Sequence, residues 1–212
     1  MRSFLLSIAL LTTPLIAEDY QPKDYSYLLG MKGFDDALLK LHFQLYQGYV
    51  KQVNLLSDAL KKFPNSTPLD TYEFGALKRR FGWEFDGMRL HELYFDNLGG
   101  KGSLPNPKSS FMESVTTQFG SFGQWKQDFV ATALMRGIGW VILYREKQTD
   151  RLFNAWIDQH DVGHLATLKP IIVLDVWEHA YLTQYGLNRA DYVEAFMNNI
   201  NWAVVDQRLK QL

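Results

Sequence analysis

The apolar positions between Phe34 and Lys62 recur at spacings of three and four residues, the period of an α-helix with one buried face. Asp35 or Asp36 provides an N-cap, lysines occupy the last turn, and the next proline is Pro64. The pattern therefore predicts one long helix. Its predicted apolar face consists of His42, Leu45, Tyr46, Tyr49, Val53, Leu56 and Leu60.

A second helical pattern covers residues 69–98, after a run of prolines and polar residues at 64–68. We expect an interruption of this helix near Gly82. The face of its final part consists of Gly87, His91, Tyr94, Phe95 and Leu98. Two consecutive helices with facing apolar stripes form an antiparallel hairpin, and here each stripe contains a histidine.

The glycine- and proline-rich run at residues 99–107 is the clearest break in the chain. We place a subdomain boundary there, with an N-terminal helical hairpin domain at 18–104 and a C-terminal domain at 105–212. The predicted elements of the second part are helices over 108–119 and 121–135, a β-hairpin of strands 140–145 and 152–157, a third strand over 170–175, and a helix around 191–196.

Residues 1–17 have the pattern of a signal peptide: a basic start at Arg2, an apolar run, and Ala17 before the acidic Glu18. The alternative is a membrane-anchoring helix, but the run is shorter than a bilayer span and is broken by Pro14. We therefore predict export to the periplasm or the medium with cleavage after Ala17. No second long apolar run follows, so we expect no membrane association after cleavage.

The composition restricts the possible chemistry. The chain has 212 residues, 47% of them apolar and 15% aromatic, which is enough material for a packed core. It has no cysteine, which excludes disulfides, iron–sulfur clusters, thiolate zinc sites and a cysteine nucleophile. A net charge of -1 gives no electrostatic case for a nucleic-acid partner. Any metal must be held by His, Asp or Glu.

Three of the five histidines are in places that suggest ligand chemistry. A lone histidine on an apolar helix face is more often a hydrogen-bonded core residue than a ligand. Here His42 and His91 are on two faces that must pack together, while Asp175 and His179 follow a strand that reads as buried. Three imidazoles and one carboxylate suit Fe, Mn, Zn or Cu better than Ca or Mg.

The string Asp175-Val176-Trp177-Glu178-His179-Ala180-Tyr181 resembles the signature of the iron/manganese superoxide dismutase family. Further matches follow in register, roughly from Tyr25 to Trp202: Tyr49-Val50 with Asn54, Phe119-Gly120-Ser121-Phe122, Gly137-Ile138-Gly139-Trp140 and Asn201-Trp202. The resemblance implies an α+β fold. An antiparallel helical hairpin precedes an α/β domain with a three-stranded antiparallel sheet, and the metal lies between them.

The resemblance also implies the metal ligands. The family's C-terminal ligands fall on Asp175 and His179, and its second-helix ligand falls on His91. On the first helix, counting back from Tyr49 without a gap places Leu41 at the ligand position. We infer a one-residue deletion that removes the family's widened helical turn and leaves His42 as the fourth ligand. The alternative is a site with three ligands or no metal.

Two further residues are expected to act beside the metal. Tyr49 corresponds to the family's gateway tyrosine. Gly87 leaves room for a side chain from elsewhere, and we assign His160 as the hydrogen-bond partner of the metal-bound solvent. A histidine from this part of the chain favours iron, with manganese close behind. Trp140 and Trp177 are expected to wall the site, and His164 has no assigned role.

The resemblance implies a homodimer, with Glu178 bonding to the last ligand of the other subunit. A His–Tyr pair that crosses the family interface falls here on Leu45 and Leu182, which predicts a drier interface and puts a proton relay through that pair in doubt. The implied function is dismutation of superoxide at one Fe or Mn ion. The alternatives are a non-catalytic metal-binding or structural protein on the same fold, and a zinc hydrolase, although the chain has no His-Glu-x-x-His pair.

Overall fold

The computed structural model describes residues 18–63, 71–100 and 104–211. The predicted signal peptide and the breaker at 64–68 lie outside these residues. Within them, no helix is long and apolar enough to cross a membrane.

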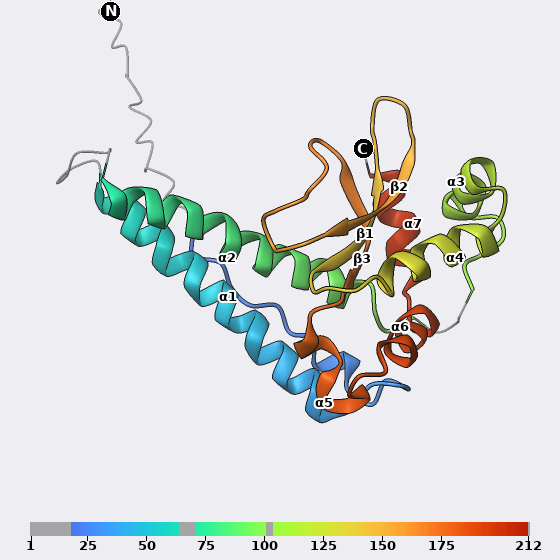
Figure 1. The fold of residues 1–212 in the computed structure, drawn as a ribbon, viewed down its shortest axis with the longest axis horizontal. Helices are drawn as coiled ribbons and strands as arrows, with labels where there is room; N and C mark the ends of the chain where they lie inside the picture. The colour runs from blue at the N-terminus through green and yellow to red at the C-terminus, as the bar shows by residue number, and fades with distance from the viewer. Residues whose placement is uncertain (1–17, 64–70, 101–103, 212) are drawn as a thin grey trace, which may run out of the picture.

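Two long helices, α1 (Asp36–Lys62) and α2 (Tyr72–Asp96), lie side by side and form the predicted antiparallel hairpin (Figure 1). The Thr71 hydroxyl caps α2 by accepting a hydrogen bond from the Phe74 N–H at 3.2 Å. The expected interruption near Gly82 is wrong, because α2 runs through it without a break. A single glycine costs a helix only about 1 kcal/mol, and here the Asp161 side chain packs against it.

The C-terminal part begins with α3 (Ser110–Phe119) and α4 (Phe122–Ala133). They are separated at Gly120, whose φ of 86° is in the region that favours glycine. Three antiparallel strands follow, β1 (Trp140–Arg145), β2 (Leu152–Ile157) and β3 (Lys169–Asp175), in the order β2-β1-β3. The predicted α+β fold is therefore confirmed.

Short helices complete the chain. A 3₁₀ turn, η1 (Ser26–Leu28), precedes α1, and η3 (Glu178–Ala180) follows β3. After η3 come α5 (Leu182–Tyr185), α6 (Arg189–Asn198) and α7 (Trp202–Lys210). Of these, the sequence pattern predicted only α6.

One buried side chain fixes the hairpin to the sheet. Asn97, at the C-terminal cap of α2, is fully buried. Its Oδ1 accepts hydrogen bonds from the Val173 N–H of β3 at 2.8 Å and from Arg208 of α7 at 3.1 Å. The hydrophobic core is continuous from the hairpin through the sheet to α7. The division at residue 104 stays a prediction. The C-terminal part of α2 packs against β3, and α1 contacts η3, which follows β3 (Figure 1).

Candidate metal centre

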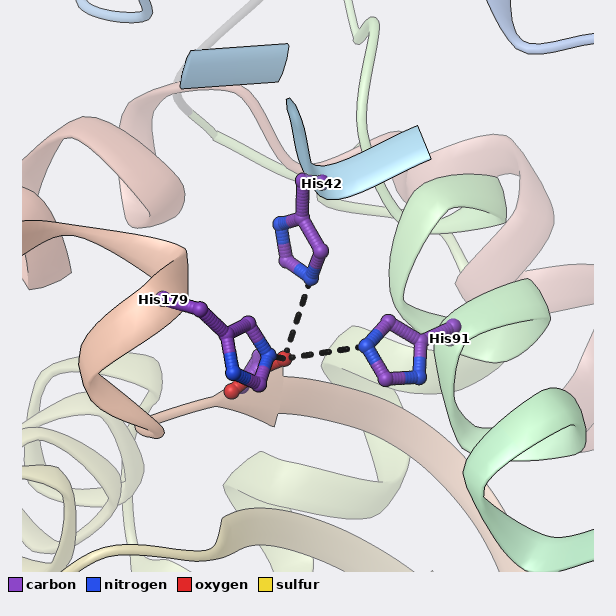
Figure 2. Close-up of side chains that lie close together, drawn as sticks. His42, His91 and His179 are labelled. Carbon is purple, nitrogen blue, oxygen red and sulfur yellow. Dashed lines mark hydrogen bonds and ion pairs between the residues drawn. The ribbon is translucent and has the colours of Figure 1, made fainter. Parts of the chain in front are cut away.

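Four side chains that can ligate a metal meet where the hairpin packs against the end of β3. They are His42 of α1, His91 of α2, Asp175 at the end of β3, and His179 of η3 (Figure 2). One ligand atom from each lies within 4.8 Å of the others. Among the described residues, no other group of this kind is present.

The three imidazoles approach the same oxygen atom of Asp175. The distances from Nε2 to Asp175 Oδ2 are 3.2 Å for His42, 3.6 Å for His91 and 3.1 Å for His179. The other carboxylate oxygen, Oδ1, accepts a hydrogen bond from the Trp177 N–H at 2.8 Å. This bond orients the carboxylate, so that Oδ2 is turned toward the three rings.

The donor atoms fit a cation between them. The Nδ1 atom of His91 lies 2.6 Å from the Gly87 carbonyl oxygen, which only accepts, so Nδ1 carries the hydrogen of a neutral ring. His91 Nε2 therefore presents a lone pair to the carboxylate oxygen 3.6 Å away. Nε2 of both His42 and His91 is buried without a hydrogen-bond partner. Facing lone pairs in a buried site repel each other unless a cation separates them, and this donor set suits iron, manganese, zinc or copper.

The protonation states agree with ligand chemistry. Burial lowers the pKa of His42 and holds that of His91 well below its usual value, which keeps both rings neutral. For Asp175, burial acts to raise the pKa, but the adjacent His179 and His42 outweigh it and hold the pKa far below its usual range. Neutral imidazoles and an ionised carboxylate are the forms that bind metals.

The first helix places His42, rather than Leu41, in this group. Helix α1 is continuous from Asp36 to Lys62, without a widened turn. His42 is 2% exposed and points at the other ligand atoms, whereas Leu41 is 55% exposed. With His42 and Tyr49 seven residues apart, a regular α-helix keeps both on the inner face.

A hydrogen-bonded chain lies beside the four residues. The indole N–H of Trp140 donates to His160 Nδ1 at 3.1 Å, so a neutral His160 ring carries its hydrogen on Nε2. That Nε2–H faces the Tyr49 hydroxyl oxygen at 2.7 Å. Burial lowers the pKa of His160 to about 4 and raises that of Tyr49, so both groups are neutral at physiological pH. The tautomer leaves the Tyr49 hydroxyl hydrogen free to donate elsewhere.

The absence of a side chain at Gly87 makes this arrangement possible. A Cβ atom there would lie 2.7 Å from Cδ1 of the Tyr49 ring, closer than real Cβ atoms come. The ring therefore lies against the backbone of α2, and it is also 5.1 Å from the His91 ring, centroid to centroid. The Tyr49 ring fills the space that the sequence predicted at Gly87, and its hydroxyl group contacts His160.

Aromatic rings wall the site. The rings of Trp177 and Trp83 lie 5.0 Å and 4.7 Å from that of His160, and Trp140 lies 5.1 Å from His91. Trp177 and Trp140 are thus where the sequence predicted them, but Trp83 was missed. The sequence contains the spacing that predicts its place, because positions 83, 87 and 91 are four residues apart and lie on one face of α2.

One edge of the site faces outward. The His179 side chain is 29% exposed, the highest value among the four candidate ligands. Its neighbour Glu178 is exposed, and no hydrogen bond or ion pair of its carboxylate is found among the described residues. Leu182 of α5 is 42% exposed. This edge is where the sequence predicted a subunit interface.

The fold and the site together define a mononuclear metalloprotein in which a helical hairpin and an α/β domain share a site of three histidines and one aspartate. The family described as iron/manganese superoxide dismutases, C-terminal domain, matches residues 107–208. This chain belongs to the iron/manganese superoxide dismutase family.

Whole-chain relatives support the assignment. An iron superoxide dismutase of Cupriavidus metallidurans is 36% identical over 175 residues, covering 81% of this chain and 86% of its own length. One of Pyrobaculum aerophilum is 31% identical over 194 residues, covering 90% of both chains. A relative of Aeropyrum pernix, named as a Mn/Fe enzyme, is 33% identical over 195 residues, covering 90% of this chain and 89% of its own.

The contact between Gly87 and Tyr49 predicts opposite effects for the same substitution at two glycines. We expect Gly87→Ala to lower the free energy of unfolding by about 1–3 kcal/mol, because the Tyr49 ring must move. Gly48→Ala, in the middle of α1 with no atom within 4 Å of the new Cβ, is the control. It should raise stability by roughly 0.5–1 kcal/mol through helix propensity. Urea denaturation measures both, and equal effects would contradict the assigned contact.

Proposed function

We propose that this chain is a superoxide dismutase that uses one iron or manganese ion held by His42, His91, Asp175 and His179. The observation that carries the proposal is the convergence of three imidazoles on one buried carboxylate, in a chain of this family. An iron or manganese ion held by these four residues would supply one-electron redox chemistry, by which one superoxide is oxidised to O2 and a second, with two protons, is reduced to hydrogen peroxide.

The residues of the chain supply position and protons. Asp175 offsets the positive charge of the site, and the imidazoles fix its geometry. The Nε2–H of His160 faces the Tyr49 oxygen, so the hydroxyl hydrogen of Tyr49 is directed away from His160 and is available for a substrate oxygen. The surrounding tryptophans restrict water, which favours transfer from a positioned donor. His160 supports iron over manganese, and the Cupriavidus and Pyrobaculum relatives are named as iron enzymes.

The ligand set and the activity are tested together with two neighbouring substitutions. The chain from Glu18 onward, loaded separately with iron and with manganese, should dismute superoxide at a rate constant on the order of 10⁸ M⁻¹s⁻¹ with one of them. His42→Ala should lose both metal and activity, because it removes one of the four donors. Leu41→Ala should keep both, because Leu41 points outward.

Metal analysis and pulse radiolysis are the measurements. Full metal content in His42→Ala would overturn the ligand assignment. A folded, metal-loaded wild type without dismutase activity would favour the non-catalytic metal-binding alternative. Hydrolysis by the zinc form without dismutation would favour the zinc hydrolase.

The proposal includes a homodimer in which a second copy covers the outward edge of the site. It is supported by the partly exposed His179, the exposed Glu178 carboxylate and the exposed Leu182. In the dimer, Glu178 accepts a hydrogen bond from His179 of the other subunit. The apolar Leu45 and Leu182 pack at the interface without leaving a buried polar group unpaired.

Glu178→Ala is expected to weaken this dimer and its activity, because His179 loses its partner across the interface. The dissociation constant of the dimer should rise by about tenfold or more, measured by sedimentation as a function of concentration. Glu113→Ala, an exposed glutamate of α3, is the control and should leave it unchanged. A wild type that sediments as a monomer at all concentrations would refute the dimer.

The last part of the proposal is export, with the enzyme acting in the periplasm or the medium. It is supported by the signal-peptide pattern of residues 1–17. When residues 1–212 are expressed in a host that exports proteins with signal peptides, a mature protein that starts at Glu18 should be found outside the cytoplasm. Fractionation followed by N-terminal sequencing tests this, and a product in the cytoplasm that retains residues 1–17 would contradict it.

A further inference from the structure

His164 uses both ring nitrogens in hydrogen bonds, one with the backbone of His160 and the other with Tyr144. Its Nε2 lies 2.6 Å from the carbonyl oxygen of His160, which only accepts, so Nε2 carries a hydrogen and donates. Its Nδ1 lies 2.7 Å from the hydroxyl oxygen of Tyr144. Burial raises the pKa of Tyr144, which keeps its hydroxyl protonated and able to donate to Nδ1.

Strand β1 therefore holds His160 at two points. Trp140 and Tyr144 are four residues apart on this strand, which places them on the same face of the sheet. Trp140 binds the ring of His160 directly, whereas Tyr144 binds its backbone carbonyl through His164. β1 is the central strand, and both side chains are buried, so the two anchors are rigid.

The segment that carries His160 needs such anchors. It lies between β2 and β3 and contains neither helix nor strand. Among the described residues, no backbone–backbone hydrogen bond involves residues 160–164. The position of the His160 backbone is thus not set by a ladder of main-chain bonds, and the bond from His164 is the contact that fixes its carbonyl.

We infer that His164 is a positioning residue for proton supply: it fixes the His160 backbone so that the ring Nε2–H meets the Tyr49 hydroxyl. The inference rests on the proposed function, in which Tyr49 and His160 serve the reaction. His164 touches neither the four candidate ligands nor Tyr49 in any hydrogen bond or ion pair of the described residues. Its loss should therefore affect proton delivery rather than metal binding.

The first test compares crystal structures of the metal-loaded protein from Glu18 onward and of three variants. In His164→Leu and in Tyr144→Phe, the distance from His160 Nε2 to Tyr49 Oη should exceed the 2.7 Å of the wild type beyond hydrogen-bonding range. His164→Gln, whose amide can donate to the same carbonyl, should restore it. An unchanged distance in both His164→Leu and Tyr144→Phe would overturn the inference, and Tyr144→Phe decides the case if His164→Leu fails to fold.

The second test is steady-state kinetics by pulse radiolysis on the same proteins. Metal content and kcat/KM should stay at the wild-type level, while kcat falls about tenfold, the usual cost of losing a supporting partner. In a His160→Gln background, His164→Leu should cause no further loss, because His164 acts through His160. Val162→Ala, an exposed residue of the same segment, is the control and should match the wild type.

Two kinetic results would overturn the inference: additive losses in the double variant, or an equal fall of kcat and kcat/KM. Failure of the proposed function is separate, because it would appear as an inactive wild type, and the crystallographic distances would still decide the role of His164.

Discussion

Three imidazole nitrogens and one ionised carboxylate oxygen share a space of a few ångströms in the protein interior, and this arrangement constrains the rest of the structure. Asp175 and His91 are fully buried, and His42 is nearly so. A buried carboxylate is costly unless it is paired, and the neutral His91 ring, which turns a lone pair toward Asp175, offers no compensation. A bound cation resolves both problems. Metal binding is therefore expected to stabilise the folded chain.

The fold meets this constraint by drawing each ligand from a different element and by orienting Asp175 and His91 through neighbouring hydrogen bonds. The Trp177 N–H orients the carboxylate of Asp175. The backbone carbonyl oxygen of Asp175 accepts a hydrogen bond from the Tyr192 hydroxyl at 2.7 Å. His91 is oriented by the Gly87 carbonyl one turn earlier in α2. Since Asn97 fixes the end of the same helix to β3, the two halves of the site cannot move apart without breaking buried hydrogen bonds.

The sequence predicted most of the fold, because both long helices have a clear 3.6-residue period and the strands are bounded by turn residues. It also predicted the four residues that meet at the site, through the string around Asp175 and the shift from Leu41 to His42. The sequence-based predictions failed where tertiary contacts determine the course of a helix or the role of a residue. Helix α2 continues through Gly82 because packing outweighs a local preference. Trp83 and His164 were missed because their roles depend on contacts between segments far apart in the chain.

The spacing of His42 and Tyr49 on α1 and the glycine at position 87 of α2 are physically coupled. In a regular α1, the spacing of seven residues puts Tyr49 directly on the face that carries His42. Its ring then approaches α2 so closely that position 87 has room only for glycine. With no side chain from α2 at this point, the partner of Tyr49 must come from another segment, and His160 fills that place. His160 lies on irregular chain, so its position depends on side chains of β1. The hydrogen-bonded support of Tyr49 therefore comes from His160 and the central strand β1.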